Sequence, residues 1–253
     1  MQPHLPRRDF LAIVFSLVGV AALSWLYLFS LADNMSMPQG MAPMQIQPWD
    51  AAYFLMMFLM WAIMMLGMML PSVIPTVLIF AAVARKSAAQ GTPVAPTGTF
   101  VLGYIFMWFV FSLLATCAQW GLDRAALLSP MMVTHSVKLG ALLLVAAGIY
   151  QWLPIKNQCL HQCRSPVDFI TRHWKPGAMG AFGMGISHGA YCLGCCWALM
   201  GLLFVGGVMN LLWIAAITLF VFLEKILPFG AIGGRVIGGV MILAGGVIAS
   251  TGG

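Results

Sequence analysis

Long apolar runs alternate with short polar segments along almost the whole chain. A helix needs about 20 apolar residues to cross the roughly 30 Å hydrocarbon core of a bilayer. Runs near this length predict an all-α fold, a polytopic membrane bundle of about seven transmembrane helices. Pro71 and Pro75 are expected to kink or end the second of them. The runs cover approximately 10–32, 49–84, 99–120, 139–153, 177–208, 210–227 and 230–250.

Composition supports the same class of protein. Hydrophobic residues make up 62% of the chain and charged residues only 7%, whereas a soluble domain carries roughly 25% charge. No polar stretch is long enough to bury a core of its own, so residues 1–253 are predicted to form a single transmembrane domain. The net charge of +6 does not indicate nucleic acid binding, because Lys and Arg occur in small clusters between apolar runs.

The distribution of positive charge predicts the orientation. With seven helices and a cytoplasmic N-terminus, ten of the twelve Lys and Arg residues, Lys156 and Lys225 among them, lie on the cytoplasmic side. Only Arg124 and Lys138 remain outside, which is a strong positive-inside bias. The segment 33–48 is then an outer loop, rich in methionine, and the segment 154–176 is a cytoplasmic loop that carries cysteine and histidine.

A cluster of thiols and one imidazole lies in the fifth apolar run. At about 100° per residue, His188, Cys192 and Cys195 share one face of a helix, with Cys196 at its edge. Three cysteines and a histidine suit a tetrahedral zinc ion, and thiolates also favour Cu(I). One straight helix cannot easily surround an ion, so a complete site requires either unwinding at Gly194 or ligands from a second helix.

Further soft donors lie elsewhere in the sequence. The loop 154–176 contains Cys159, His161 and Cys163, which form a second candidate ligand group. The second helix carries a stripe of methionines on about a third of its circumference, and thioethers select Cu(I) over zinc. Met60 and Met64 are therefore candidate ligands, while Cys117 is interpreted as a packing residue. The stripe consists of Met56, Met57, Met60, Met64 and Met68, and the outer loop holds Met35, Met37, Met41 and Met44.

The cysteine pattern of residues 154–200, together with Leu70-Pro71-Ser72 at the end of the methionine stripe, resembles a bacterial family of predicted metal-binding integral membrane proteins with no settled reaction. The resemblance implies a multi-pass protein of the bacterial inner membrane that binds a metal ion. Its motif includes Gly194-Cys195-Cys196-Trp197. The implied metal-ligating residues are Cys159, Cys163, His188, Cys192, Cys195 and Cys196, while His161 is added on spacing alone.

These groups suggest an order across the membrane: outer methionines first, then the membrane cysteines, then His188, and finally Cys159 and Cys163 inside. The leading hypothesis is a soft-metal protein, with copper favoured and zinc as the alternative ion, that transfers or transports the ion across the membrane. No nucleotide-binding loop is evident, so movement is passive, ion-coupled or driven by a soluble metal-binding partner protein.

Two other functions fit the same residues. One is a membrane thiol–disulfide oxidoreductase that uses Cys192 and Cys195 as its redox pair. The other is an assembly or scaffold subunit with a structural metal. Enzyme activity is not required by any motif. The small residues Gly185 and Gly189 are compatible with a homo-oligomer.

Overall fold

The computed structural model describes residues 5–36, 49–128, 133–134, 136–227 and 230–251, and helices account for the regular structure in these ranges apart from one isolated bridge between Leu128 and Thr134. The all-α prediction is confirmed. The helices are α1 (Arg7–Ser36), α2 (Ala51–Ala89), α3 (Thr97–Arg124), α4 (Val137–Trp152), α5 (Pro154–Arg164), α6 (Pro166–His173), α7 (Gly177–Gly201), α8 (Leu203–Gly206), α9 (Leu211–Ile226) and α10 (Gly230–Thr251).

Five helical segments in the described part of the chain are long and apolar enough to cross a membrane: α1, α2, α3, α7 with α8, and α10. The pair α4 and α5 would be a sixth if it is one broken span, since its two helices differ in direction by 65°. The count of seven spans is not confirmed. Helices α4 and α9 form where expected but have 16 residues each, about 24 Å at 1.5 Å per residue, which is less than a bilayer core.

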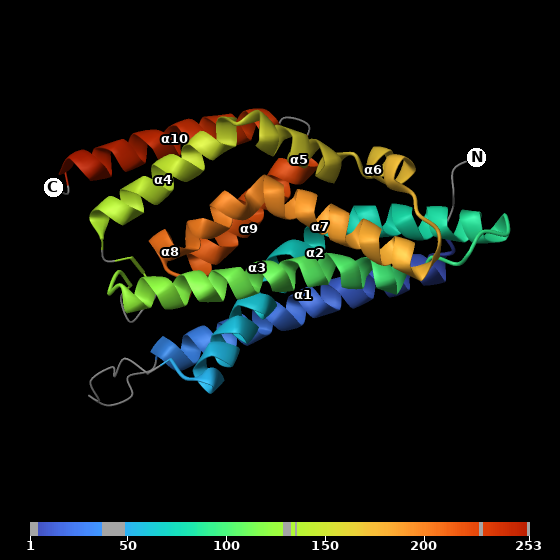
Figure 1. Ribbon diagram of the computed structural model, residues 1–253, viewed down its shortest axis with the longest axis horizontal. Helices are drawn as coiled ribbons and strands as arrows, with labels where there is room; N and C mark the ends of the chain where they lie inside the picture. Colours follow the sequence, from blue (N-terminus) through green and yellow to red (C-terminus); the bar gives the residue numbers. More distant parts are fainter. Residues whose placement is uncertain (1–4, 37–48, 129–132, 135, 228–229, 252–253) are drawn as a thin grey trace.

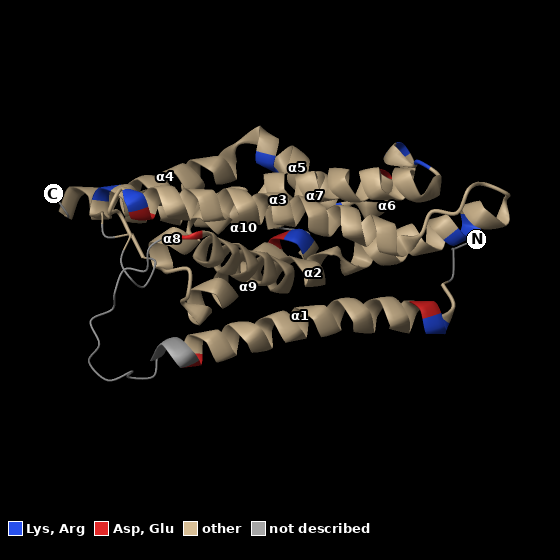
Figure 2. Ribbon diagram, turned by 60° about the horizontal axis from the view of Figure 1, so that its bottom comes forward, with Lys and Arg blue, Asp and Glu red and all other residues tan. Residues whose placement is uncertain are grey.

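The helices are arranged as a bundle with a shorter layer on one side (Figure 1). Helices α1, α2, α3 and α7 run along the long axis, and α4 packs against α10 above them. Helix α9 ends, and α10 begins, near the middle of that axis, while the start of α1 and the end of α10 lie toward opposite ends of it. Charged residues gather at both ends of the bundle, with others near its middle around α5 and α9 (Figure 2).

The segment 154–176 is not the loop that its polar composition suggested. It contains α5 and α6, and α5 lies across the middle of α7 (Figure 1). Pro154 occupies the first turn of α5, where its missing N–H has no intrahelical partner to lose. The chain bends between α4 and α5, and this bend lays α5 against α7.

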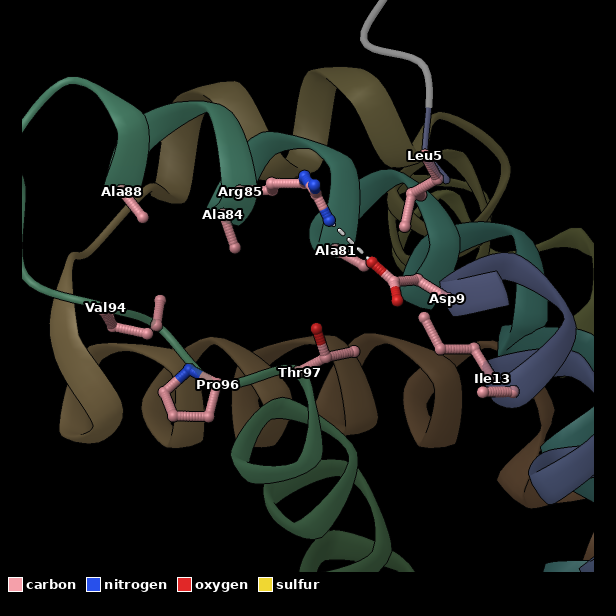
Figure 3. Close-up of a pocket in the computed structure, with 12 residues that line it drawn as sticks. Leu5, Asp9, Ile13, Ala81, Ala84, Arg85, Ala88, Val94, Pro96 and Thr97 are labelled. Carbon is pink, nitrogen blue, oxygen red and sulfur yellow. Dashed lines mark hydrogen bonds and ion pairs between the residues drawn. The ribbon is translucent and has the colours of Figure 1, made fainter. Parts of the chain in front are cut away.

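Helix α2 continues through both of its prolines to Ala89 instead of ending at them. The Ser72 hydroxyl donates to the Met69 carbonyl oxygen at 2.9 Å. Beyond that point α2 reaches a pocket of about 390 Å³ between α1 and the α2–α3 connection. The Asp9 carboxylate and the Arg85 guanidinium form an ion pair there at 2.8 Å (Figure 3), and none of the lining residues is Cys, His or Met.

Glycines let α3 and α7 approach closely. A Cβ atom at Gly103 would lie 2.2 Å from the Phe182 carbonyl oxygen, and one at Gly185 would lie 2.0 Å from that of Phe100. A Cβ at Gly189 would meet Met107 at 2.7 Å. Gly185 and Gly189 therefore serve packing within the chain, and they no longer support a homo-oligomer.

Gly185→Ala is expected to lower the thermal unfolding midpoint in detergent by roughly 5 °C or more, because the added methyl group would overlap the α3 backbone. The matched control is Gly183→Ala on the same helix, where a Cβ would have no neighbour within 4 Å. Since alanine favours helix by about 1 kcal/mol over glycine, the control should be neutral or stabilising. Equal midpoints for the two variants would contradict the close α3–α7 contact.

Candidate metal centre

Helix α7 carries His188, Cys192, Cys195 and Cys196 on its inner side, and all four are buried. The thiols of Cys195 and Cys196 each donate to the Cys192 carbonyl oxygen at 3.0 Å. The helix is continuous at Gly194, whose carbonyl oxygen accepts a hydrogen bond from the Tyr150 hydroxyl. Helix α7 therefore does not unwind at Gly194 to complete a metal site, so further ligands must come from a second helix.

A second helix supplies thiols, and it is α5. Cys159 and Cys163 are four residues apart, which places them on one face of this helix. The Cys163 thiol lies close to the thiols of Cys192 and Cys195. A Cβ at Gly194 would lie 2.7 Å from the Cys159 sulfur, so the Cys159 side chain packs directly against the backbone of Gly194.

This arrangement corrects the predicted order of ligands across the membrane. Cys159 and Cys163 do not form a separate ligand group on the cytoplasmic side of the α7 cysteines. Helix α5 folds back along α7 and places both at the level of Gly194 and its neighbouring cysteines. We call Cys159, Cys163, Cys192, Cys195 and Cys196 the thiol cluster. All of its cysteines are free thiols, and the sixth cysteine, Cys117, is exposed on α3.

Two further helices bring polar groups to Cys192. The Lys225 ammonium on α9 donates to the Cys192 sulfur at 3.0 Å and to the Ser72 hydroxyl at 3.1 Å, and it lies 3.8 Å from the Met69 sulfur. The Tyr104 hydroxyl on α3 lies 3.1 Å from the Cys192 sulfur. An ammonium favours the thiolate over the thiol, and the thiolate is the form that binds metal ions.

A buried ion pair lies next to this contact. The Lys156 ammonium donates to the Glu224 carboxylate and to the Gln151 side-chain oxygen. Lys156 is 1% exposed, Glu224 3% and Lys225 8%. The predicted orientation places Lys156 and Lys225 among the cytoplasmic charges, but both are interior groups, so they do not contribute to a positive-inside bias.

His188 lies one turn before Cys192 among aromatic rings. Its ring centroid is 4.9 Å from that of Phe169, 6.0 Å from Tyr104 and 6.2 Å from Phe100. Within the described residues its Nδ1 atom is buried without a hydrogen-bond partner. A buried nitrogen without a partner is costly, and a bound soft ion would compensate for it.

The remaining predicted ligands are not brought to the thiol cluster. His161 is exposed and lines an open pocket of about 550 Å³ with Arg164 and Arg235. Met60 and Met64 are buried in the core, as a methionine wall requires, whereas Met56 is 48% exposed. Met69 contacts the site, with its sulfur 3.8 Å from the Lys225 ammonium. Residues 37–48, which hold Met37, Met41 and Met44, lie outside the described residues, as does the Met35 side chain.

The donor set fits a soft ion of low coordination number. In the part of the chain that the structure describes, no group of three or more Cys, His, Asp or Glu side chains is arranged around one ion. The thiols of Cys195 and Cys196 are directed to a carbonyl oxygen, and the Cys192 sulfur faces Lys225. Thiolates select Cu(I), which accepts as few as two of them, whereas structural zinc sites use four ligands.

Comparison with known proteins adds one result. The sequence model of the PpoB2 copper chaperone family matches residues 58–248. The chain belongs to this family. The match begins within α2 and ends within α10, so it includes the whole thiol cluster together with His188, Lys225 and Tyr104. No curated protein and no solved structure matches the chain.

Membership in the PpoB2 copper chaperone family confirms the expectation of a metal-related family, and it connects the chain with copper. Sequence reasoning missed Lys225, Tyr104 and Met69 as neighbours of the thiols. A lysine and a glutamate in an otherwise apolar helix were a usable signal for Lys225, since such charges need partners. Tyr104 and Met69 carried no signal that separates them from ordinary core residues.

Proposed function

We propose that this chain binds Cu(I) at the thiol cluster between α5 and α7 and transfers the ion across the bacterial inner membrane. The observation that carries the proposal is the Cys192 sulfur, which is buried against thiols of two helices and contacted by a lysine ammonium at 3.0 Å. A buried lysine beside a cysteine favours a thiolate, and a set of thiolates in an apolar interior suits a soft monovalent ion. The family's association with copper supports the same ion.

In this proposal residues 1–253 form one membrane domain with a cytoplasmic N-terminus, and the bilayer surrounds its apolar helices. Cys163 and Cys192 would be the first pair of ligands, because they join the two helices. Cys159, Cys195, Cys196 and His188 would exchange with them as the ion moves, and Met69 lies at the same place. The outer methionines, Met60, Met64 and His161 remain candidates for capture or release on either side of the cluster. A soluble metal-binding protein would deliver or accept the ion.

The same cluster also favours a second candidate function. A thiol close to a lysine-stabilised thiolate is the arrangement of a dithiol redox pair, and Cys192 has both Cys163 and Cys195 within reach. A membrane thiol–disulfide oxidoreductase would pass two electrons and two protons from this pair to an acceptor such as a quinone. It would cycle between dithiol and disulfide without retaining a metal.

The test measures copper and zinc per chain, together with free thiols, in detergent-purified protein. Near-stoichiometric copper is expected in the native chain and in the control Cys117→Ser, whose site is exposed on α3. Copper should fall at least about tenfold in the combined Cys192→Ser, Cys195→Ser, Cys196→Ser variant, because oxygen is a hard ligand that binds Cu(I) poorly. In sealed liposomes, the native chain and the control should also accelerate Cu(I) accumulation, and the triple variant should not.

Two results would overturn the proposal. Purified protein that contains zinc and no copper would show that the bound ion is zinc. Purified protein without metal, whose thiols oxidise and reduce reversibly, would favour the thiol–disulfide oxidoreductase. Copper binding without accelerated accumulation would restrict the function to storage or delivery on one side.

A further inference from the structure

Lys225 has no carboxylate partner of its own among the described residues. It is buried on α9, and its ammonium contacts a thiol sulfur, a hydroxyl and a thioether. The carboxylate beside it in sequence, Glu224, is engaged by Lys156. None of the ion pairs in the described ranges includes Lys225. The positive charge of Lys225 is therefore directed at the thiol cluster.

We infer that Lys225 is the counter-charge of the metal site and that it sets a preference for a monovalent over a divalent ion. This inference rests on the proposed function and names a specificity-determining residue for it. Lys225 is a positioning residue in this role, since it contacts Cys192 and does not bind the ion. Its ammonium nitrogen carries no free lone pair, so it acts only through its charge and its hydrogen bonds.

The charge balance shows why the ion should be monovalent. A Cu(I) ion held by two thiolates leaves one negative charge in excess, and the Lys225 ammonium neutralises it. A buried site that is neutral as a whole avoids the large cost of an uncompensated charge in an apolar interior. Binding breaks one S–H bond for each thiol that becomes a ligand, the protons leave to solvent, and copper does not change its oxidation state.

A zinc ion fits this balance poorly. Two thiolates already neutralise Zn(II), so the Lys225 ammonium would remain as an excess positive charge close to a cation. A third thiolate would restore neutrality, but the thiols of Cys195 and Cys196 are hydrogen-bonded to the Cys192 carbonyl oxygen and would have to turn away from it. Lys225 thus opposes the divalent ion and supports the monovalent one, although both are soft enough to bind thiolates.

The experiment compares Cu(I) and Zn(II) dissociation constants, measured by competition with chromophoric chelators, in the native chain and in Lys225→Leu. Leucine removes the charge without adding a soft donor, whereas methionine would bring a thioether that binds Cu(I). Cu(I) affinity should fall at least about tenfold, and Zn(II) affinity should stay the same or rise, because the charge lies within a few ångströms of the ligands. The matched control is Lys138→Leu, which removes a lysine from an exposed position on α4 and should leave both constants unchanged.

The ratio of the Cu(I) and Zn(II) dissociation constants distinguishes a role of Lys225 in metal selectivity from a role in folding alone. An equal loss of both metals, or no change in either, would overturn the inference. If Lys225→Leu does not yield folded protein, Lys225→Gln replaces it, since its amide can still donate to Ser72 and Cys192, and the same change in ratio is expected. Failure of the native chain to bind copper would instead overturn the proposed function, so the two failures are distinguishable.

Discussion

Lys156→Met is expected to destabilise the folded chain by about 3–5 kcal/mol, because it removes one member of a buried ion pair and leaves the other. The group left behind is Glu224, whose carboxylate is 3% exposed and is engaged by the Lys156 ammonium. Without Lys156 this buried carboxylate would have to stay charged without its partner or take up a proton. The thermal unfolding midpoint in detergent should fall by roughly 10 °C, about twice the fall expected for Gly185→Ala.

The decisive comparison adds Glu224→Gln to the Lys156→Met variant and measures the stability of this double variant. Replacing both members of a buried ion pair by neutral groups is often close to neutral, so the double variant should recover most of the lost stability. An exposed pair gives the second control. Arg172 and Asp168 are 2.7 Å apart on α6, and their side chains are 70% and 33% exposed, so Arg172→Met should cost less than about 1 kcal/mol. A double variant as unstable as Lys156→Met alone would show that Lys156 acts through packing and not through its charge.

The helices were predictable because long apolar runs report burial or lipid contact directly. A helix begins within a few residues of each predicted start, but the predicted fifth helix, 177–208, is divided into α7 and α8, and α2 extends five residues beyond its predicted end. The number of crossings was not predictable, because α4 and α9 are too short to cross alone and turn near the middle of the molecule. A hydropathy pattern contains no information on where a helix stops relative to the bilayer.

The prediction of a loop at residues 154–176 was wrong for a different reason. Its charges suggested solvent, but Lys156 has its partner on α9, 68 residues away. A pair this distant in sequence cannot be recognised from one chain, although the spacing of Cys159 and Cys163 was compatible with a helical face. The cysteines of α7 were recognised because thiol and imidazole groups at that spacing are unusual in an apolar run. The helix that supplies the other thiols, α5, was not recognised, because it reaches the α7 cysteines only through the bend after α4.

Cys163→Ser is expected to weaken Cu(I) binding at least about tenfold, as much as Cys192→Ser does, although the two residues lie on different helices. The Cys163 thiol is within reach of both Cys192 and Cys195, so it joins α5 to the α7 thiols. Serine keeps the size of the side chain and removes the soft donor. Loss of even an outer-shell partner of a metal site costs about 10- to 100-fold in affinity, and a ligand should cost no less. Competition with a Cu(I) chelator measures this directly.

The neighbouring histidine makes the prediction specific to one face of α5. His161 lies two residues from Cys163 and lines the open pocket on the other side of the helix, so His161→Ala should leave the Cu(I) dissociation constant within about twofold of the native value. Cys163→Ser protein that retains native affinity, beside a His161→Ala variant that loses it, would mean that α5 presents its opposite face to the ion. The bend after α4 would then deliver an imidazole to the site instead of two thiols, and the ligand set would change from thiolates alone to a mixture of sulfur and nitrogen.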